Sequence, residues 1–168
     1  MQTLKRLFDF YIHASIHVAF AVLSLVLMTN HMFQQSFDLP MAGFAFFGTL
    51  FGYNFIKYEV YFREKLTFRK SLTSTLVLSL LSIIASIYFF FLLEFKTQVA
   101  AIVFFGLTFL YTVPVFSTKK NMRNWSGIKI YIVAFCWAGV TTLLPMMNFG
   151  MDLYQDIFVK FCQRFLLV

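Results

Sequence analysis

Charged residues are scarce in this chain, where they make up 12% of 168 residues while 60% are hydrophobic. A soluble globular protein carries about 25% charged residues, so the composition excludes that class. The apolar residues come in blocks of about 20, separated by short polar breaks. A helix of that length crosses a hydrocarbon core about 30 Å thick. The sequence therefore predicts an all-α fold, a polytopic membrane helical bundle.

Cysteines and acidic residues are also few. The two cysteines, Cys136 and Cys162, lie far apart in apolar segments, which leaves a disulfide framework or a cysteine metal site without support. No acid falls in the middle of a predicted span, so little favours a channel or transporter. The net charge of +7 comes from basic residues in the breaks between spans, which form no long basic face, and we expect no nucleic-acid partner.

The apolar blocks predict five transmembrane helices within a single domain covering residues 1–168. Residues 94–97 form a very short turn, which makes the third and fourth helices antiparallel neighbours. Gly48 and Gly52 form a small-xxx-small pair in the second helix and predict close approach of another helix. The predicted spans are residues 10–29, 41–60, 72–93, 98–116 and 128–147.

The last stretch, residues 153–168, has two interpretations. It is either an amphipathic interfacial helix or the first part of a sixth span that continues past Val168. We favour the partial span, and with it a chain that is the N-terminal part of a longer bundle. In the first interpretation one helix face carries Phe158, Phe161, Cys162 and Phe165.

The distribution of basic residues predicts the orientation. Eleven of the fourteen lie on one side of the predicted spans, and positive charge marks the cytoplasmic side of a membrane protein. The N-terminus and the loops at 61–70 and 117–127 are therefore expected to be cytoplasmic. Two clustered basic loops at a membrane surface would attract an anion, and a pyrophosphate on an apolar tail suits such a place.

Polar residues gather where the second predicted helix meets this surface. Asn54, Lys57, Tyr58 and Tyr61 fall at i, i+3, i+4 and i+7, which is one helical stripe, and Glu59 lies beside it. Polar and ionisable groups at membrane depth indicate a cavity or a functional site.

Two histidines lie in the first predicted span. His13 and His17 have the i, i+4 spacing of some metal sites, but no third ligand is evident. We therefore interpret them as buried histidines that bond to neighbouring helices.

The order of segments resembles a known family. A short basic N-terminus is followed by a span, a second span ending in G-Y-N-x-x-x-Y (52–58), two spans joined by a tight turn, then Y-T-V-P (111–114) and a basic loop with G-I-K (127–129). This pattern resembles the N-terminal part of the UbiA superfamily of intramembrane prenyltransferases. The resemblance covers nearly all of this chain and a little over half of such an enzyme.

The resemblance implies a site at the end of the second helix. In the family, Mg²⁺ joins an isoprenyl diphosphate to two aspartate-rich motifs, the first reading N-D-x-x-D-x-x-x-D. Asn54 matches its first position and is the candidate metal ligand, while Phe55, Tyr58 and Phe62 stand where the aspartates would be. Tyr58 and the out-of-register Glu59 complete the motif remnant. The implied diphosphate-binding residues are Arg69, Lys70, Lys119, Lys120 and Arg123.

Two functions follow as expectations. The first is a Mg²⁺-dependent membrane prenyltransferase that moves an isoprenyl chain from its diphosphate to a lipophilic acceptor. In that case Tyr53, Tyr58 or Tyr111 is placed to stabilise an allylic cation through its ring. The second is a non-catalytic UbiA-like protein that acts as a scaffold and binds a membrane lipid or a partner protein. The missing aspartates favour the second, because Mg²⁺ prefers carboxylate and phosphate oxygens.

Overall fold

The computed structural model describes residues 2–63, 70–112, 128–151 and 155–167. Over these residues the chain is helical and forms no strand, which confirms the all-α prediction. The elements in chain order are α1 (Gln2–His13), α2 (Ile16–Met32), α3 (Leu39–Arg63), α4 (Lys70–Phe90), α5 (Phe95–Thr112), α6 (Ile128–Ala138), the π-helical segment η2 (Gly139–Leu143), α7 (Leu144–Asn148) and α8 (Gln155–Leu167).

The helices fit a membrane protein. By length and composition, two described segments can cross a membrane, Leu39–Lys57 in α3 and Ile130–Asn148 through α6, η2 and α7. The bent pair Leu7–His13 and Ile16–Met32 makes a third if it counts as one span. Ser74–Phe90 and Phe95–Leu110 are shorter apolar helices. The number of five spans therefore stays a prediction, as does the orientation.

The first predicted span is not one continuous helix, which corrects the prediction for residues 10–29. The segments on either side of Ala14 and Ser15 are bent by 63° from one another. Ser15 has a φ of 59°, in the left-handed region that breaks an α-helix. No glycine or proline marks this position, so the apolar pattern runs through the break without a signal.

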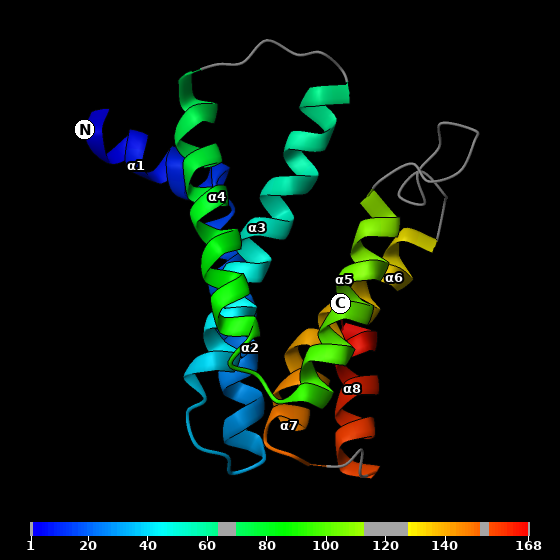
Figure 1. Ribbon diagram of the computed structural model, residues 1–168. Coiled ribbons are helices and arrows are strands. Elements are labelled where there is room, and N and C mark those ends of the chain that lie inside the picture. Colours follow the sequence, from blue (N-terminus) through cyan, green and yellow to red (C-terminus); the bar gives the residue numbers. More distant parts are fainter. Residues whose placement is uncertain (1, 64–69, 113–127, 152–154, 168) are drawn as a thin grey trace.

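The second and third apolar blocks form a helical hairpin. α3 and α4 pack side by side in opposite directions, and α2 lies against α3 (Figure 1). A Cβ added at Gly48 would lie 3.3 Å from Ser86 Oγ of α4, so this glycine permits a close approach, as expected. Gly52 has no described atom within 4 Å of such a Cβ, so that half of the predicted pair is not used.

A tight turn at residues 91–94 joins α4 to α5 and reverses the chain, as expected. The two helices are not packing neighbours, which corrects that part of the prediction: α4 packs on α3, whereas α5 packs on α6 and α7. Gln98 closes it, because its side-chain amide donates hydrogen bonds to the carbonyl oxygens of Phe90 at 3.1 Å and Leu93 at 3.0 Å. Carbonyls at a helix end lack hydrogen-bond partners within the helix, and the Gln98 amide supplies partners for these two.

The core lies between α2, α3, α5 and α7. Its buried side chains come from these four helices and from the turn after α4, and α2 also contacts η2. Apolar side chains on α4 remain exposed, as expected where lipid replaces water. The buried core consists of Val22, Val26, Met41, Ala45, Leu93, Ala101, Phe104 and Leu144. The exposed residues of α4 include Val77, Leu80, Leu81, Ile84, Ile87 and Tyr88.

The last helix, α8, packs against α6 and η2. The Phe161 ring meets Phe135 edge-on at 5.5 Å, and Phe165 stacks on Tyr131 at 6.4 Å. Phe158 is 59% exposed, so the aromatic residues of α8 do not share one buried face. α8 is thus part of the bundle, and whether a sixth span continues beyond it stays a prediction.

Candidate functional site

Asn54 is buried, whereas Lys57, the other residue of the predicted stripe whose side chain the structure describes, is exposed. The Asn54 side chain is 0% exposed, and neither its amide oxygen nor its amide nitrogen has a hydrogen-bond partner among the described residues. A buried amide without partners costs about 1–3 kcal/mol. Such an uncompensated group is expected where a ligand completes the hydrogen bonds.

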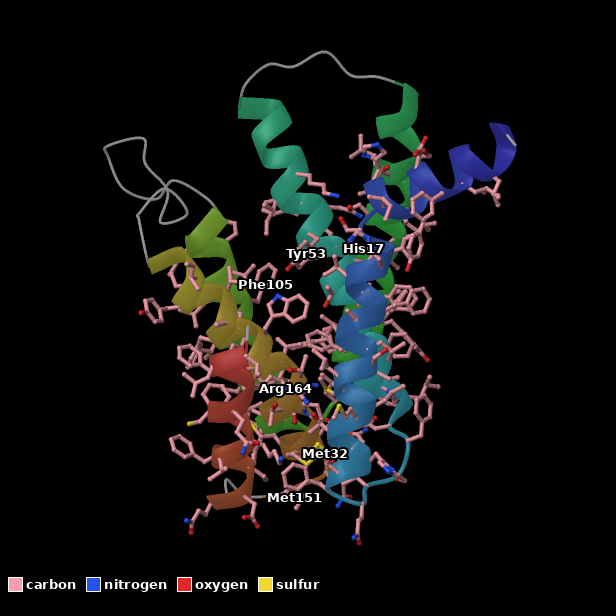
Figure 2. All side chains as sticks on the ribbon, turned by 180° about the vertical axis from the view of Figure 1, so that it is seen from behind. His17, Met32, Tyr53, Phe105, Met151 and Arg164 are labelled. Atoms are coloured by element: carbon pink, nitrogen blue, oxygen red, sulfur yellow. The ribbon has the colours of Figure 1, made fainter. Side chains whose placement is uncertain are left out.

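Tyr53, the residue before Asn54 in the chain, forms an aromatic pair with Trp137. The indole nitrogen of Trp137 in α6 donates a 3.1 Å hydrogen bond to the Tyr53 hydroxyl in α3. The two rings are edge to face at 6.5 Å, and Figure 2 shows Tyr53 on the side of α3 that faces α6. The pair therefore joins α3 to α6 at the residue that precedes Asn54. A positive charge near these rings would be stabilised by their π electrons.

Lys57 has a structural role that the stripe did not predict. Its ammonium group donates hydrogen bonds to the carbonyl oxygen of His13 at 2.8 Å and to the hydroxyl of Ser15 at 2.7 Å. His13 ends α1, so the bond satisfies a carbonyl that the broken helix leaves open. Lys57 thus holds the corner between α1 and α2, and two of its three N–H donors are used there.

The other predicted site residues are placed only in part. Tyr58 and Glu59 belong to α3 and Lys70 begins α4, but the structure does not describe their side chains. The side chain of Tyr111 is not described either. The remaining predicted diphosphate ligands lie outside the described residues. These are Arg69, Lys119, Lys120 and Arg123. Their assignment stays a prediction.

The described residues do not fit a Mg²⁺ site by themselves. Asn54 offers one neutral amide oxygen, and Phe55 occupies the next position with a ring that contacts Phe51 at 5.8 Å. No group of three or more His, Cys, Asp or Glu side chains able to hold a metal occurs in the described part of the chain. Because Mg²⁺ binds through oxygen ligands, carboxylates above all, magnesium stays an expectation from the resemblance alone.

The two histidines of the first segment do not form a pair. Because the helix breaks between them, His13 and His17 no longer share the i, i+4 geometry of a continuous helix. Both side chains are exposed, so their interpretation as buried histidines was wrong. The His17 ring instead contacts Tyr11 at 5.9 Å.

A polar cluster that the sequence did not reveal connects α8 to the bundle. Arg164 Nη1 donates to the carbonyl oxygens of Leu25 at 3.1 Å and Thr141 at 3.0 Å, and to the Thr29 hydroxyl at 2.9 Å (Figure 2). Thr141 lies in η2, and the residue four positions on, which would donate to its carbonyl in an α-helix, is Pro145, which has no backbone N–H. The cluster fixes three elements at one point.

No local signal identified Trp137 or Arg164 as important residues. Trp137 lies in an apolar span and Arg164 in a segment whose interpretation was open. Their partners are 84 and 135 positions away in the chain.

Comparison of the chain with protein-family models, with curated proteins and with solved structures gave no match.

Proposed function

We propose that this chain is a UbiA-like membrane prenyltransferase that binds an isoprenyl diphosphate with its headgroup at Asn54 and passes the isoprenyl chain to a lipophilic acceptor. The observation that supports the proposal is the fully buried Asn54 amide, which has no partner among the described residues. It occupies the one position of the family's first motif that this chain retains.

The Asn54 amide suits the end of a diphosphate. Its N–H groups donate to phosphate oxygens, and hydrogen bonds to a charged group are worth about 1.5–3 kcal/mol. The basic loops predicted at 61–70 and 117–127 carry cations that would share the charge. Asn54 would therefore orient the leaving group rather than take part in bond formation.

The aromatic pair Tyr53 and Trp137 suits the other end of the reacting bond. Loss of diphosphate from an isoprenyl diphosphate leaves positive charge on the allylic carbon, and attack by the acceptor removes it. An aromatic face within about 6 Å of that carbon would stabilise the charge. The hydrogen bond between Trp137 and Tyr53 would hold both rings in place.

The second candidate is a non-catalytic scaffold of the same fold. Phe55, Tyr58 and Phe62 at the three aspartate positions favour it, since they supply no carboxylate for a dication. Such a protein would bind an isoprenyl diphosphate or another lipid without releasing diphosphate.

Asn54→Leu tests the proposal, with Asn30→Leu as the matched control. Asn30 is another buried asparagine whose amide atoms have no partner among the described residues, but it lies near the opposite end of the bundle in α2. Leucine has nearly the same volume and removes the cost of burying an amide, so both variants are expected to be as stable as the parent or more stable. Only Asn54→Leu should weaken binding of farnesyl diphosphate, by about tenfold or more.

The measurement is binding of farnesyl diphosphate to the purified protein in lipid nanodiscs, followed by diphosphate release with Mg²⁺ present. Binding that Asn54→Leu lowers and Asn30→Leu does not, with release, supports the transferase. The same binding without release supports the scaffold. If the parent chain does not bind farnesyl diphosphate, or if the two variants lose binding equally, neither the transferase nor the scaffold has its binding site at Asn54.

A further inference from the structure

We propose that α1 is not part of a membrane span but lies along the membrane surface, with its apolar side in the boundary between the lipid headgroups and acyl chains. The inference concerns α1, which Lys57 contacts at His13 and Ser15, and not the candidate site at Asn54. It does not depend on the proposed activity.

One stripe of α1 is apolar and uncovered. Leu4, Leu7 and Phe8 are 73%, 62% and 63% exposed, and Ile12 is 41% exposed. With the partly buried Tyr11 they fall at i, i+3, i+4, i+7 and i+8, the spacing of one helix side. A short amphipathic helix with such a stripe is expected to bury it at an interface.

The polar positions of α1 argue against a place in the hydrocarbon. Asp9 and His13 are both exposed, so no described neighbour shields them. An exposed carboxylate in the bilayer core is costly, whereas the headgroup region hydrates it. α1 therefore has one side for lipid chains and another for water.

The corner at Ser15 sets the direction of α1. α2 continues for 17 residues beyond it, about the shortest helix that crosses a bilayer, so α2 does not need α1 to complete a span. The bend of 63° turns α1 away from the direction of α2, and Figure 1 shows it leaving the bundle sideways. If α2 is upright, α1 is closer to the membrane plane than to its normal.

Lys57 places this corner at the membrane surface. Its ammonium group bonds to His13 and Ser15 at the corner, and the side chain is still exposed. A long basic side chain near a helix end extends toward the headgroups, where its charge stays hydrated. The same bonds hold the corner, so α1 leaves the bundle at that depth.

The charge of α1 identifies the lipid. Its sequence contains Lys5 and Arg6 against the single acid Asp9. Anionic lipids attract basic residues near the surface, so a leaflet containing phosphatidylglycerol or phosphatidylserine is the expected partner.

Spin labels on both sides of α1 test this placement in the full chain. The labels are attached to Leu4→Cys, Phe8→Cys, Asp9→Cys and His13→Cys, one at a time, in a Cys136→Ala, Cys162→Ala background. The proteins are placed in nanodiscs of phosphatidylcholine and phosphatidylglycerol. Collisions with oxygen, which concentrates in lipid, are compared with collisions with a water-soluble nickel chelate.

The ratio of oxygen to nickel collisions should be several-fold higher at Leu4 and Phe8 than at Asp9 and His13, with the first two labels about 5–10 Å below the headgroups. Three results would overturn the proposal. Depth that increases steadily from Leu4 to His13 makes α1 the start of a span. Equal nickel contact at all four positions puts α1 in water, and protection from both reagents at Leu4 and Phe8 means that protein covers the stripe.

A second measurement keeps the test decisive if the cysteine-free chain does not fold. Leu7→Trp and Asp9→Trp retain both native cysteines and change only exposed positions. Once the emission of the parent chain, which contains Trp125 and Trp137, is subtracted, brominated acyl chains should quench the added tryptophan of Leu7→Trp several-fold more than that of Asp9→Trp. Equal quenching in the two variants would overturn the proposal.

Discussion

Arg164 in α8 donates a hydrogen bond to the Thr29 hydroxyl in α2 at 2.9 Å, although 135 positions separate them in the chain. The Thr29 hydroxyl is also within hydrogen-bond distance of the Thr141 carbonyl oxygen, at 2.7 Å. One guanidinium group therefore joins the last described helix to the first half of the bundle and to η2.

Arg164→Met should destabilise the protein by about 1.5–3 kcal/mol, because hydrogen bonds from a charged donor are lost inside the bundle. Arg164→Lys keeps the charge but not the planar group of donors, and should recover only part of the loss. Thermal unfolding in detergent measures both. Gln163→Ala is the control, since Gln163 is exposed on the same helix. A transition for Arg164→Met equal to that of Gln163→Ala would show that the cluster contributes nothing.

Gly139→Ala should cost about 1–3 kcal/mol, because a Cβ there would overlap the Phe104 ring of α5. Gly106→Ala should be neutral or slightly stabilising, since no described atom lies within 4 Å of its Cβ. Equilibrium unfolding of the two variants makes the comparison. Adding Phe104→Leu to Gly139→Ala should recover part of the loss, and no recovery would place the strain elsewhere.

Tyr53→Phe and Trp137→Phe should be coupled by about 0.5–1.5 kcal/mol, the net value of one hydrogen bond. A double-mutant cycle on unfolding free energies measures this coupling directly. Both replacements keep an aromatic ring, so packing changes little in the Tyr53 variant. Additive effects of the two changes would mean that the bond does not hold α3 to α6.

Lys57→Met should loosen the corner between α1 and α2, because it removes the bonds to His13 and Ser15. Amide hydrogen exchange in α1 should become several-fold faster, while exchange in the core helices changes little. Lys160→Met removes the same charge from α8 and should leave α1 unchanged. If amide exchange in α1 is as fast in the parent as in Lys57→Met, Lys57 does not fix the corner between α1 and α2.

The helical class and the reversal between α4 and α5 were predictable because both depend on local information. Blocks of apolar residues long enough to cross a bilayer show in the composition itself. The turn was expected at 94–97 and lies at 91–94, and it is so short that the chain can only reverse there; Gln98 then completes it. The break at Ser15 was missed because a serine in a left-handed conformation has no distinctive sequence pattern.

The candidate site was predictable only as a location. The spacing of Asn54 and Lys57 puts them on one stripe of α3, yet the structure gives them different surroundings. Asn54 is enclosed, whereas Lys57 reaches the α1–α2 corner. Helical periodicity gives the direction of a side chain from its own helix, but not which neighbour it meets.

Long apolar blocks and scarce charge were enough to indicate a helical membrane protein, because both can be read from the order and composition of the residues. The tertiary structure alone decided which polar groups meet: Tyr53 with Trp137, Arg164 with Thr29, and Lys57 with Ser15. These contacts join residues 42 to 135 positions apart. They depend on how helices pack against one another, and local sequence carries no record of that packing.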